Sequence, residues 1–211
     1  MRALVTGFEA FGGASANASY AAVARLPARL GALEIVTALL PTSYAQSGAT
    51  LVREIERVKP AVVLCVGEAG ERHELNVERI AINVQDARIA DNDGAQPVDV
   101  PIANGASAAY FATLPVRAIH AALVDARLPA TVSNSAGTFV CNHVFYTLMH
   151  FAATSRPTFL GGFLHVPAWR EQAPPAKSNA AMTLDDIVRG ITIALEVSAA
   201  HAPSKVSARP A

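Results

Sequence analysis

Short apolar runs that resemble strands alternate with helix-like segments along most of this chain. Residues 61–66 form a continuous apolar run, which is typical of a central strand that is buried on both faces of a sheet. Leu51, Ile55 and Val58 come just before it at the spacing of one helix face, and Pro60 ends that helix. Strands that alternate with helices predict an α/β fold, with a mostly parallel twisted sheet and helices on both faces.

The other predicted elements continue this alternation. From Asp86 to about Ala109 no period is sustained, and a loop of this length in a compact domain is usually functional or contacts another subunit. Thr183 and Asp186 form a pattern similar to a capping box, which predicts the start of the last helix. Further strands are expected at residues 3–6, 33–40, 76–84, 130–133 and 157–166, and further helices at residues 17–26, from residue 113, and at residues 138–153.

The composition fits one ordinary domain. The chain has 211 residues, of which 52% are apolar and only 16% are charged, so it can bury a sizeable core. We expect residues 1–200 to form a single α/β domain that carries the active site. Residues 201–211 are small, polar and contain proline, so we expect a flexible tail there. The low charge also hints that some apolar surface is covered by self-association.

Charge, hydropathy and cysteine content exclude several classes of protein. The formal net charge is zero and there is no long basic run, which argues against a nucleic-acid partner. The longest apolar stretches are too short to span a bilayer, and the first residues lack the long apolar region of a signal peptide. Cys65 and Cys141 are too few for a disulfide framework, which favours a reducing, cytoplasmic location.

A polar turn leads into an apolar helix at Cys141. The turn, Ser133-Asn134-Ser135-Ala136-Gly137-Thr138, follows a predicted strand, and in such sheets sites form beyond the carboxyl ends of strands. A thiol at a helix start faces unpaired N–H groups and the positive end of the dipole, which favours the nucleophilic thiolate. The alternative is a small buried apolar residue, the interpretation that suits Cys65 between Leu64 and Val66.

A cysteine nucleophile needs a base, and the base needs a group that orients it. Among six histidines, His165 ends a predicted strand and is expected at the same sheet edge as Cys141, whereas His143 should point to another side of its helix. Glu78 lies in an otherwise apolar segment, where a carboxylate requires a partner. The alternative for Glu78 is a structural salt bridge to Arg79 or Arg88.

The glycine-rich segment Gly7-Phe8-Glu9-Ala10-Phe11-Gly12-Gly13 follows the first predicted strand. It lacks the Lys-Ser/Thr pair of a phosphate loop and the spacing of a dinucleotide fingerprint, which argues against nucleotide binding. Phe8 and Phe11 on a flexible turn would suit a flat, apolar ligand. The alternative is that both rings only cover the end of the sheet.

These segments together resemble the pyroglutamyl peptidase I family, also called pyrrolidone-carboxylate peptidases. The resemblance runs from Leu4 to about Leu195 and depends on the number, order and spacing of its blocks. The blocks are residues 6–13, 78–83, 86–94, 133–143 and 162–167. The resemblance implies a single three-layer α/β/α domain that assembles as a homodimer or homotetramer and uses no metal or cofactor.

The resemblance also implies an activity: a thiol aminopeptidase that removes an N-terminal pyroglutamyl residue from peptides through a thioacyl-enzyme. Cys141 would be the nucleophile, His165 the base and Glu78 the residue that orients and stabilises the imidazolium. Arg88 would lie beside them and help with charge. The implied substrate-binding residues are Phe8, Phe11, Asn17, Glu68, Phe139 and Val140.

Three residues depart from the family pattern. Glu68 stands where Gln is expected, Glu71 where Gly is usual and Ala10 where Pro is common. Glu68 could therefore alter the affinity for the lactam or its pH dependence. Two other functions stay open, a catalytically silent protein that binds a small amide or a cyclised peptide end, and a nucleoside phosphorylase-like transferase. The transferase would need an anion site, for which no basic cluster stands out.

Overall fold

A computed structural model describes residues 1–155, 158–170 and 182–202. Its main sheet has seven strands in the order β2-β3-β1-β4-β9-β5-β8, and β6 and β7 form a separate two-stranded sheet. The strands are β1 (Arg2–Phe8), β2 (Arg29–Leu30), β3 (Leu33–Leu40), β4 (Val62–Glu68), β5 (Leu75–Glu78), β6 (Ile80–Ile82), β7 (Ala109–Phe111), β8 (Ala130–Ser133) and β9 (Leu160–Val166). The helices are α1 (Ala18–Val23), α2 (Ser47–Val58), α3 (Val116–Asp125), α4 (Val140–Ser155) and α5 (Leu184–His201).

The main sheet is mostly parallel, as the sequence predicts. β3, β1, β4 and β9 pair in parallel along the middle of the sheet. β5 is antiparallel to β9, β8 is parallel to β5, and the short β2 is antiparallel to β3. The antiparallel β5–β9 pair matters for the site, because it places residues from the ends of two strands of opposite direction side by side.

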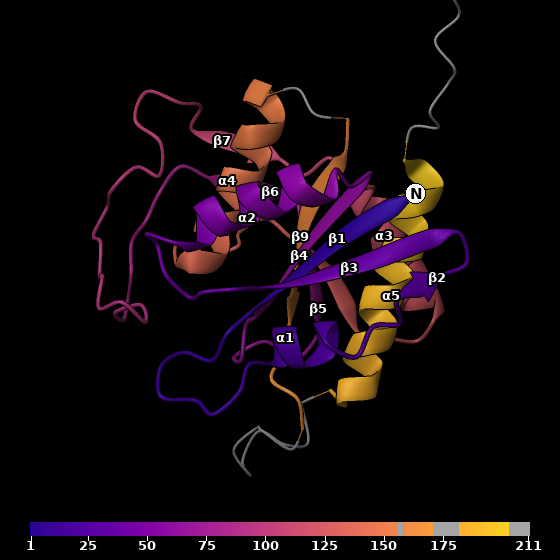
Figure 1. Cartoon of the computed structure of the whole chain (residues 1–211). Helices are drawn as coiled ribbons and strands as arrows, with labels where there is room; N and C mark the ends of the chain where they lie inside the picture. The colour runs from indigo at the N-terminus through magenta and orange to yellow at the C-terminus, as the bar shows by residue number, and fades with distance from the viewer. Residues whose placement is uncertain (156–157, 171–181, 203–211) are drawn as a thin grey trace, which may run out of the picture.

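Helices cover both faces of this sheet (Figure 1). One core lies between the sheet and α1, α3 and α5, with Leu75, Ile119 and Ile187 among its buried residues. The other lies between the sheet and α2 and α4, with Leu51, Phe145 and Phe163. Two cores on opposite faces of one sheet give the expected three-layer α/β/α architecture. None of the helices in the described ranges is long and apolar enough to cross a membrane.

A close approach between β1 and α1 builds one side of the site. A Cβ on Gly7 would lie 2.7 Å from the backbone N and Cα of Tyr20, so only glycine allows α1 to pack this closely on the strand. Asn17 caps α1, since its Oδ1 accepts a hydrogen bond from Ser19 N–H at 3.0 Å. The cap brings the first turn of α1 against the carboxyl ends of β1 and β4.

Some element boundaries differ from the expected ones. Residues 76–84 do not form one strand, because the chain leaves the main sheet at Arg79. The Arg79 N–H still donates to Ser133 O, next to β8, whereas the Arg79 carbonyl already accepts from Ala112 N–H, next to β7. At the other end of the chain α5 includes His201, and Ala202 is buried at its C-cap. Pro157 and residues 203–211 lie outside the described residues, so the flexible tail stays a prediction.

Candidate active site

A cavity of about 140 Å³ lies where the carboxyl ends of several strands meet the start of α4. Phe8 ends β1, Glu68 ends β4, and His165 is the penultimate residue of β9. This edge of the sheet is the one at which the sequence predicts a site. The cavity is lined by Phe8, Phe11, Asn17, Thr42, Glu68, Ala136, Phe139, Val140, Cys141 and His165.

Cys141 is the second residue of α4 and is partly exposed, whereas Cys65 in β4 is fully buried. The turn before α4 contains Gly137 with φ 75°, a left-handed conformation that favours glycine. The Cys141 sulfur occupies the space above Gly67, where a Cβ would lie only 2.9 Å from Sγ. Cys141 is therefore the thiol that faces the cavity.

The surroundings of Cys141 favour a neutral thiol in the free protein. Burial raises the pKa of Cys141 to about 12, and the negative charge of Glu78 adds to this increase. The positive charge of Arg72 opposes it, and Glu68 raises the pKa further. These influences oppose the thiolate that the start of α4 favours. A base must take the proton when the sulfur attacks.

His165 and Glu78 form a buried pair behind Cys141. His165 Nδ1 lies 2.8 Å from Glu78 Oε1, and the two residues are 4% and 0% exposed. The register of β5 and β9 produces this contact, because Asn76 lies opposite His165 and Glu78 lies opposite Phe163. Since the carboxylate can only accept, Nδ1 carries the proton in this hydrogen bond. The other ring nitrogen, Nε2, is thereby left as the acceptor.

Glu78 forms a salt bridge with Arg72, and not with Arg79 or Arg88 as the alternative interpretation of Glu78 would have it. Arg72 Nη1 lies 2.7 Å from Glu78 Oε1. Arg88 is exposed, and its carbonyl accepts a hydrogen bond from the side chain of Gln96. Arg88 does not line the cavity, so the structure gives no support for its expected role beside the site. From the sequence, Arg72 can be placed in the loop between β4 and β5, but the direction of its side chain cannot be predicted.

Aromatic rings form one wall of the cavity. Phe8 is 2% exposed and packs on Phe163 with ring centroids 6.3 Å apart, so it belongs to β1 and not to a flexible turn. The rings of Phe11 and Phe139 pack with their centroids 5.9 Å apart. Tyr44 and Phe139 form a T-shaped pair with centroids 5.7 Å apart. The sequence analysis missed Tyr44 as a support for this wall, and it also missed Thr42 and Ala136 in the lining.

Polar groups also line the cavity. The side chain of Asn17 donates from Nδ2 to Glu9 O at 3.0 Å, and its Oδ1 accepts from both the N–H and the hydroxyl of Ser19. Glu68 Oε2 accepts from Ala18 N–H at 2.6 Å, at the start of α1. Both side chains are thus held by α1 and its cap while they line the cavity.

The two histidines of α4, His143 and His150, do not line this cavity. His143 packs edge-on against Tyr44 between α2 and α4, and burial lowers its pKa to about 4. His150 stacks on Tyr146 and lies 3.0 Å from the Tyr110 hydroxyl. Over residues 1–155, 158–170 and 182–202, three or more His, Cys, Asp or Glu side chains nowhere gather in a way that could hold a metal ion.

Sequence comparison identifies the family. A sequence model described as pyroglutamyl peptidase matches residues 1–201. The chain belongs to the pyroglutamyl peptidase family. It is 43% identical to the pyrrolidone-carboxylate peptidase of Alkaliphilus oremlandii, over 94% of this chain and 93% of that protein. It is 47% identical to the corresponding protein of Streptococcus pyogenes, over 92% of this chain and 91% of that protein.

Solved structures of the family have the same fold. The pyroglutamyl peptidase I of Bacillus amyloliquefaciens matches with a TM-score of 0.91 at 41% identity, over 96% of this chain and 98% of that chain. A mutant pyrrolidone carboxyl peptidase of Pyrococcus furiosus matches with a TM-score of 0.90 at 35% identity, over 95% and 99% of the two chains. The membership makes this chain an enzyme of the hydrolase class, and the predicted family and α/β fold are confirmed.

Proposed function

We propose that this chain is a cysteine peptidase that removes an N-terminal pyroglutamyl residue from peptides, with Cys141, His165 and Glu78 as its catalytic residues. One observation carries the proposal: Cys141 and His165 line the same cavity, and Glu78 holds Nδ1 of His165 from behind. That arrangement of a nucleophile, a base and an orienting carboxylate is the one that acyl transfer requires.

The reaction begins with proton transfer from Cys141 to Nε2 of His165 as the sulfur attacks the scissile carbonyl carbon. Because burial raises the pKa of Cys141, we expect the transfer and the attack to be coupled. The resulting imidazolium is stabilised by the Glu78 carboxylate. It then gives its proton to the leaving amine as the C–N bond breaks, which leaves a thioester on Cys141. Water, activated by neutral His165, hydrolyses the thioester and releases pyroglutamate.

The start of α4 supplies donors for the negative charge that develops on the carbonyl oxygen. The first N–H groups of a helix have no intrahelical acceptor. In α4 the bond from His143 N–H to Phe139 O marks the first closed turn, so the N–H groups of Val140 and Cys141 precede it. One such donor contributes roughly 3 kcal/mol to stabilisation of the transition state.

The cavity suits a small neutral lactam. Its size of about 140 Å³ limits the ligand to one small ring, and Phe8, Phe11 and Phe139 give apolar walls. A pyroglutamyl residue has no N-terminal ammonium, so its ring can enter this apolar space without loss of a hydrated charge. Asn17 uses one Nδ2 hydrogen on Glu9 O, which leaves the second for the ring carbonyl.

The test is hydrolysis of a pyroglutamyl chromogenic amide under reducing conditions by the wild type, Cys141→Ala and Cys65→Ala. Cys65 is a matched control because it is the other free cysteine and lies in the core. We expect turnover to vanish only in Cys141→Ala. Turnover that persists in that variant would place the nucleophile elsewhere. Binding of the amide without turnover by the folded wild type would instead favour a silent binding protein.

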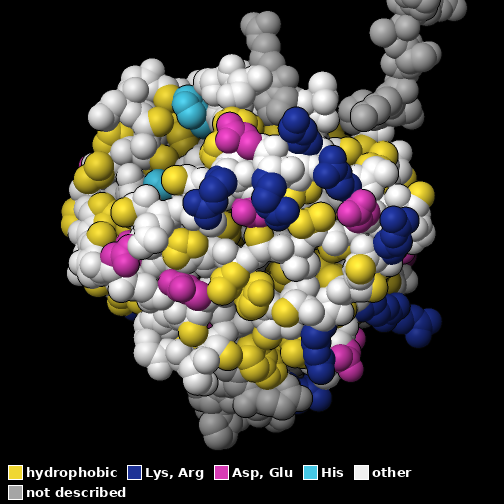
Figure 2. All heavy atoms as spheres, viewed as in Figure 1, with side chains coloured by type: hydrophobic (Ala, Val, Ile, Leu, Met, Phe, Trp, Pro, Cys, Tyr) yellow, Lys and Arg dark blue, Asp and Glu magenta, His cyan; other side chains and the backbone are white. Residues whose placement is uncertain are grey.

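We also propose that the protein assembles as a homodimer or homotetramer. Its exposed large apolar side chains include Val98, Val100 and Phe111. Val98 and Val100 lie in the long loop before β7, and Phe111 is the last residue of β7. Figure 1 shows this loop and β7 on the same side of the molecule. On the face shown in Figure 2, apolar side chains lie among acidic and basic ones. A second copy of the chain is the partner that would cover such apolar positions.

A further inference from the structure

Arg72 is the central contact of a small polar network behind the cavity. It lies in the loop between β4 and β5, with its side chain 32% exposed, while the Glu78 side chain that it contacts is fully buried. Nη1 donates to Glu78 Oε1 at 2.7 Å and to Asn76 Oδ1 at 2.8 Å. Nη2 donates to Ser135 O at 2.9 Å. A single guanidinium thus bonds to β5 and to the turn before α4.

A single carboxylate oxygen of Glu78 accepts the hydrogen bonds from both Arg72 and His165. Oε1 accepts from both Arg72 and His165 Nδ1, while Oε2 has no hydrogen-bond partner among the described residues. A buried carboxylate is costly unless it is paired with a cation and hydrogen-bonded. Arg72 supplies that cation, and its hydrogen bond holds Oε1 against His165 Nδ1. The guanidinium therefore supports the carboxylate that stabilises the imidazolium.

The contact with Ser135 connects the same guanidinium to the nucleophile. Ser135 lies in the turn that ends at the first residue of α4, and Cys141 is the next residue. This turn is exposed on its outer side and holds itself through bonds between Ser133 and Ser135. The planar fork of Arg72 can hold the turn and the carboxylate at once, which a lysine ammonium cannot do with the same geometry.

We propose that Arg72 is a positioning residue of the catalytic site, which fixes Glu78 as a carboxylate against His165 and fixes the turn that carries Cys141. The proposal depends on the function proposed above. It gives Arg72 the role beside the site that the sequence resemblance assigns to Arg88. The other interpretation is that Arg72 only stabilises the β4–β5 loop, in which case its loss would lower stability without a change in the chemistry of Cys141.

The rate at which Cys141 is alkylated measures the reactivity of its thiol directly and needs no peptide substrate. The positive charge of Arg72 lowers the pKa of Cys141, so its removal is expected to move the alkylation profile to higher pH. The other groups that act on this thiol or lie beside it are not substituted in any of the variants. They are Glu68 and Cys65 on β4, Glu78 on β5, His165 on β9 and Tyr44 before α2.

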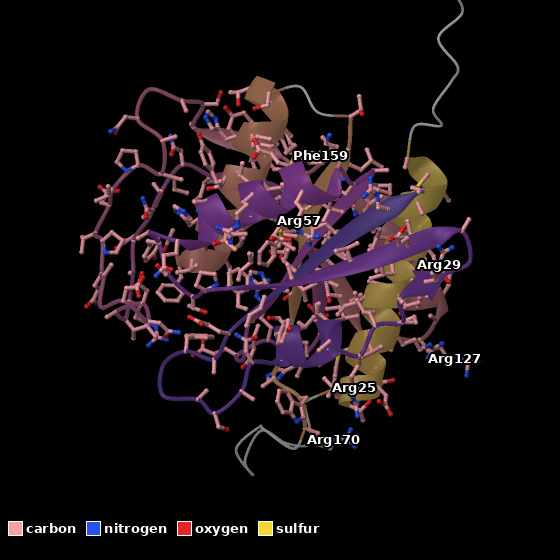
Figure 3. All side chains as sticks on the ribbon, in the orientation of Figure 1. Arg25, Arg29, Arg57, Arg127, Phe159 and Arg170 are labelled. Carbon is pink, nitrogen blue, oxygen red and sulfur yellow. The ribbon has the colours of Figure 1, made fainter. Side chains whose placement is uncertain are left out.

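The experiment compares the wild type with Arg72→Gln, Arg72→Lys and a control, Arg57→Gln. Arg57, labelled in Figure 3, is a surface arginine in the last turn of α2 that pairs with Glu54. It precedes the start of β4, whereas Arg72 follows the end of β4, so the control removes the same charge at the other end of that strand. For each protein we would measure the rate of Cys141 alkylation by iodoacetamide against pH, kcat and KM for a pyroglutamyl amide, and the melting temperature.

For Arg72→Gln we expect kcat to fall by about 100-fold with little change in KM, as for a misplaced catalytic group. Its alkylation profile should move to higher pH. Arg72→Lys should recover most of the alkylation profile but only part of kcat, and Arg57→Gln should match the wild type in both. The proposal is overturned if Arg72→Gln melts lower while its alkylation profile and kcat stay at wild-type values.

A different result would contradict the proposed function than would contradict the role of Arg72. If the wild type does not hydrolyse the amide, the peptidase assignment is lost, yet the alkylation profiles still decide the role of Arg72. Profiles that differ between the wild type and Arg72→Gln support the contact with the site, and identical profiles overturn it.

Discussion

Gly67 leaves the space that the Cys141 sulfur occupies. A Cβ at residue 67 would lie 2.9 Å from Sγ and 2.7 Å from Cζ of Phe163, so the sulfur or the ring would have to move. We expect Gly67→Ala to lower kcat/KM by about 100-fold, because a shift of about 1 Å in a reacting group costs that much. Hydrolysis of a pyroglutamyl amide by the folded variant is the measurement.

Gly70→Ala is the matched control for that substitution. A Cβ there would have only ordinary contacts, with Glu68 Oε1 at 3.4 Å and the Ala168 side chain at 4.0 Å. Its turnover should stay close to that of the wild type. Equal activity in both variants would show that the sulfur can shift without cost, and the close contact at Gly67 would have no catalytic meaning.

Glu68 affects the thiol through its charge. It contributes to the raised pKa of Cys141, and its Oε2 accepts a hydrogen bond from Ala18 N–H. A glutamine oxygen could still accept that bond, so we expect Glu68→Gln to keep most of the turnover. Because a negative charge is removed, the Cys141 alkylation profile should move to lower pH. A large loss of turnover would mean that the carboxylate itself binds the substrate.

The sequence predicted some residues of the site and missed others, and the difference has a physical reason. His165 lies near the carboxyl end of β9, at the edge where the parallel strands β1 and β4 also end, and the alternating pattern predicts a site there. β8, the strand before Cys141, runs opposite to β9, so Cys141 reaches this edge through the turn before α4 and not through the direction of its strand. Arg72 and Thr42 lie in loops whose paths depend on tertiary contacts. The direction of the Arg72 side chain follows from a loop that folds back on β5, which no local pattern encodes.

At the scale of elements, the contact between α2 and α4 contains the half-buried His143. A Cβ on Gly48 of α2 would lie 3.2 Å from its Nε2, and its buried Nδ1 has no hydrogen-bond partner among the residues that the structure describes. Burial lowers the pKa of His143 to about 4, from its ordinary value of 6.5. The folded protein therefore keeps this ring neutral at pH values where the unfolded chain binds a proton.

The sign of the effect follows from linkage. Above pH 6.5 neither state is protonated at His143 and no stability is lost, whereas between pH 6.5 and 4 the unfolded chain gains the proton first. We expect a loss of up to about 3 kcal/mol in the free energy of unfolding over this range from His143 alone. In His143→Phe that loss should disappear. Urea unfolding at pH 7.5 and pH 4.5 measures it.

His201→Gln is the control for the acid measurement, since His201 is exposed at the end of α5. Its stability should fall with pH as much as that of the wild type. If His143→Phe loses the same free energy as the wild type between the two pH values, the acid sensitivity comes from other groups and the neutral state of His143 does not contribute.

Element types were more predictable than element partners. The range 33–40 is β3 and the range 130–133 is β8, because apolar runs bounded by proline or polar turns mark strands wherever they pair. The single strand expected at residues 76–84 is two strands in two sheets. Apolar residues recur through both halves, and the change of partner at Arg79, from Ser133 to Ala112, separates them.

At the scale of the whole molecule, the surface around the long loop before β7 carries exposed apolar side chains. Val98 is 71% exposed and Phe111 is 66% exposed. The loop is nonetheless held to the body of the protein, because Asp91 accepts from Tyr44 N–H and Asn92 donates to Glu9 and Ala10. A loop that is fixed at its base and apolar at its surface can present a stable contact to a second copy.

We therefore expect the wild type to have a mass of two or four chains of 22.0 kDa in light scattering, and the double variant Val98→Asp, Phe111→Asp to have the mass of one. Val124→Asp, at an exposed apolar position on α3, is the control and should keep the assembly. Cys141, His165 and Glu78 come together within one chain, so we expect the dissociated variant still to hydrolyse a pyroglutamyl amide. A wild type of 22.0 kDa at all concentrations would contradict the assembly. A dissociated variant without turnover would instead show that contact between copies supports the Asp91–Asn92 anchor beside the cavity.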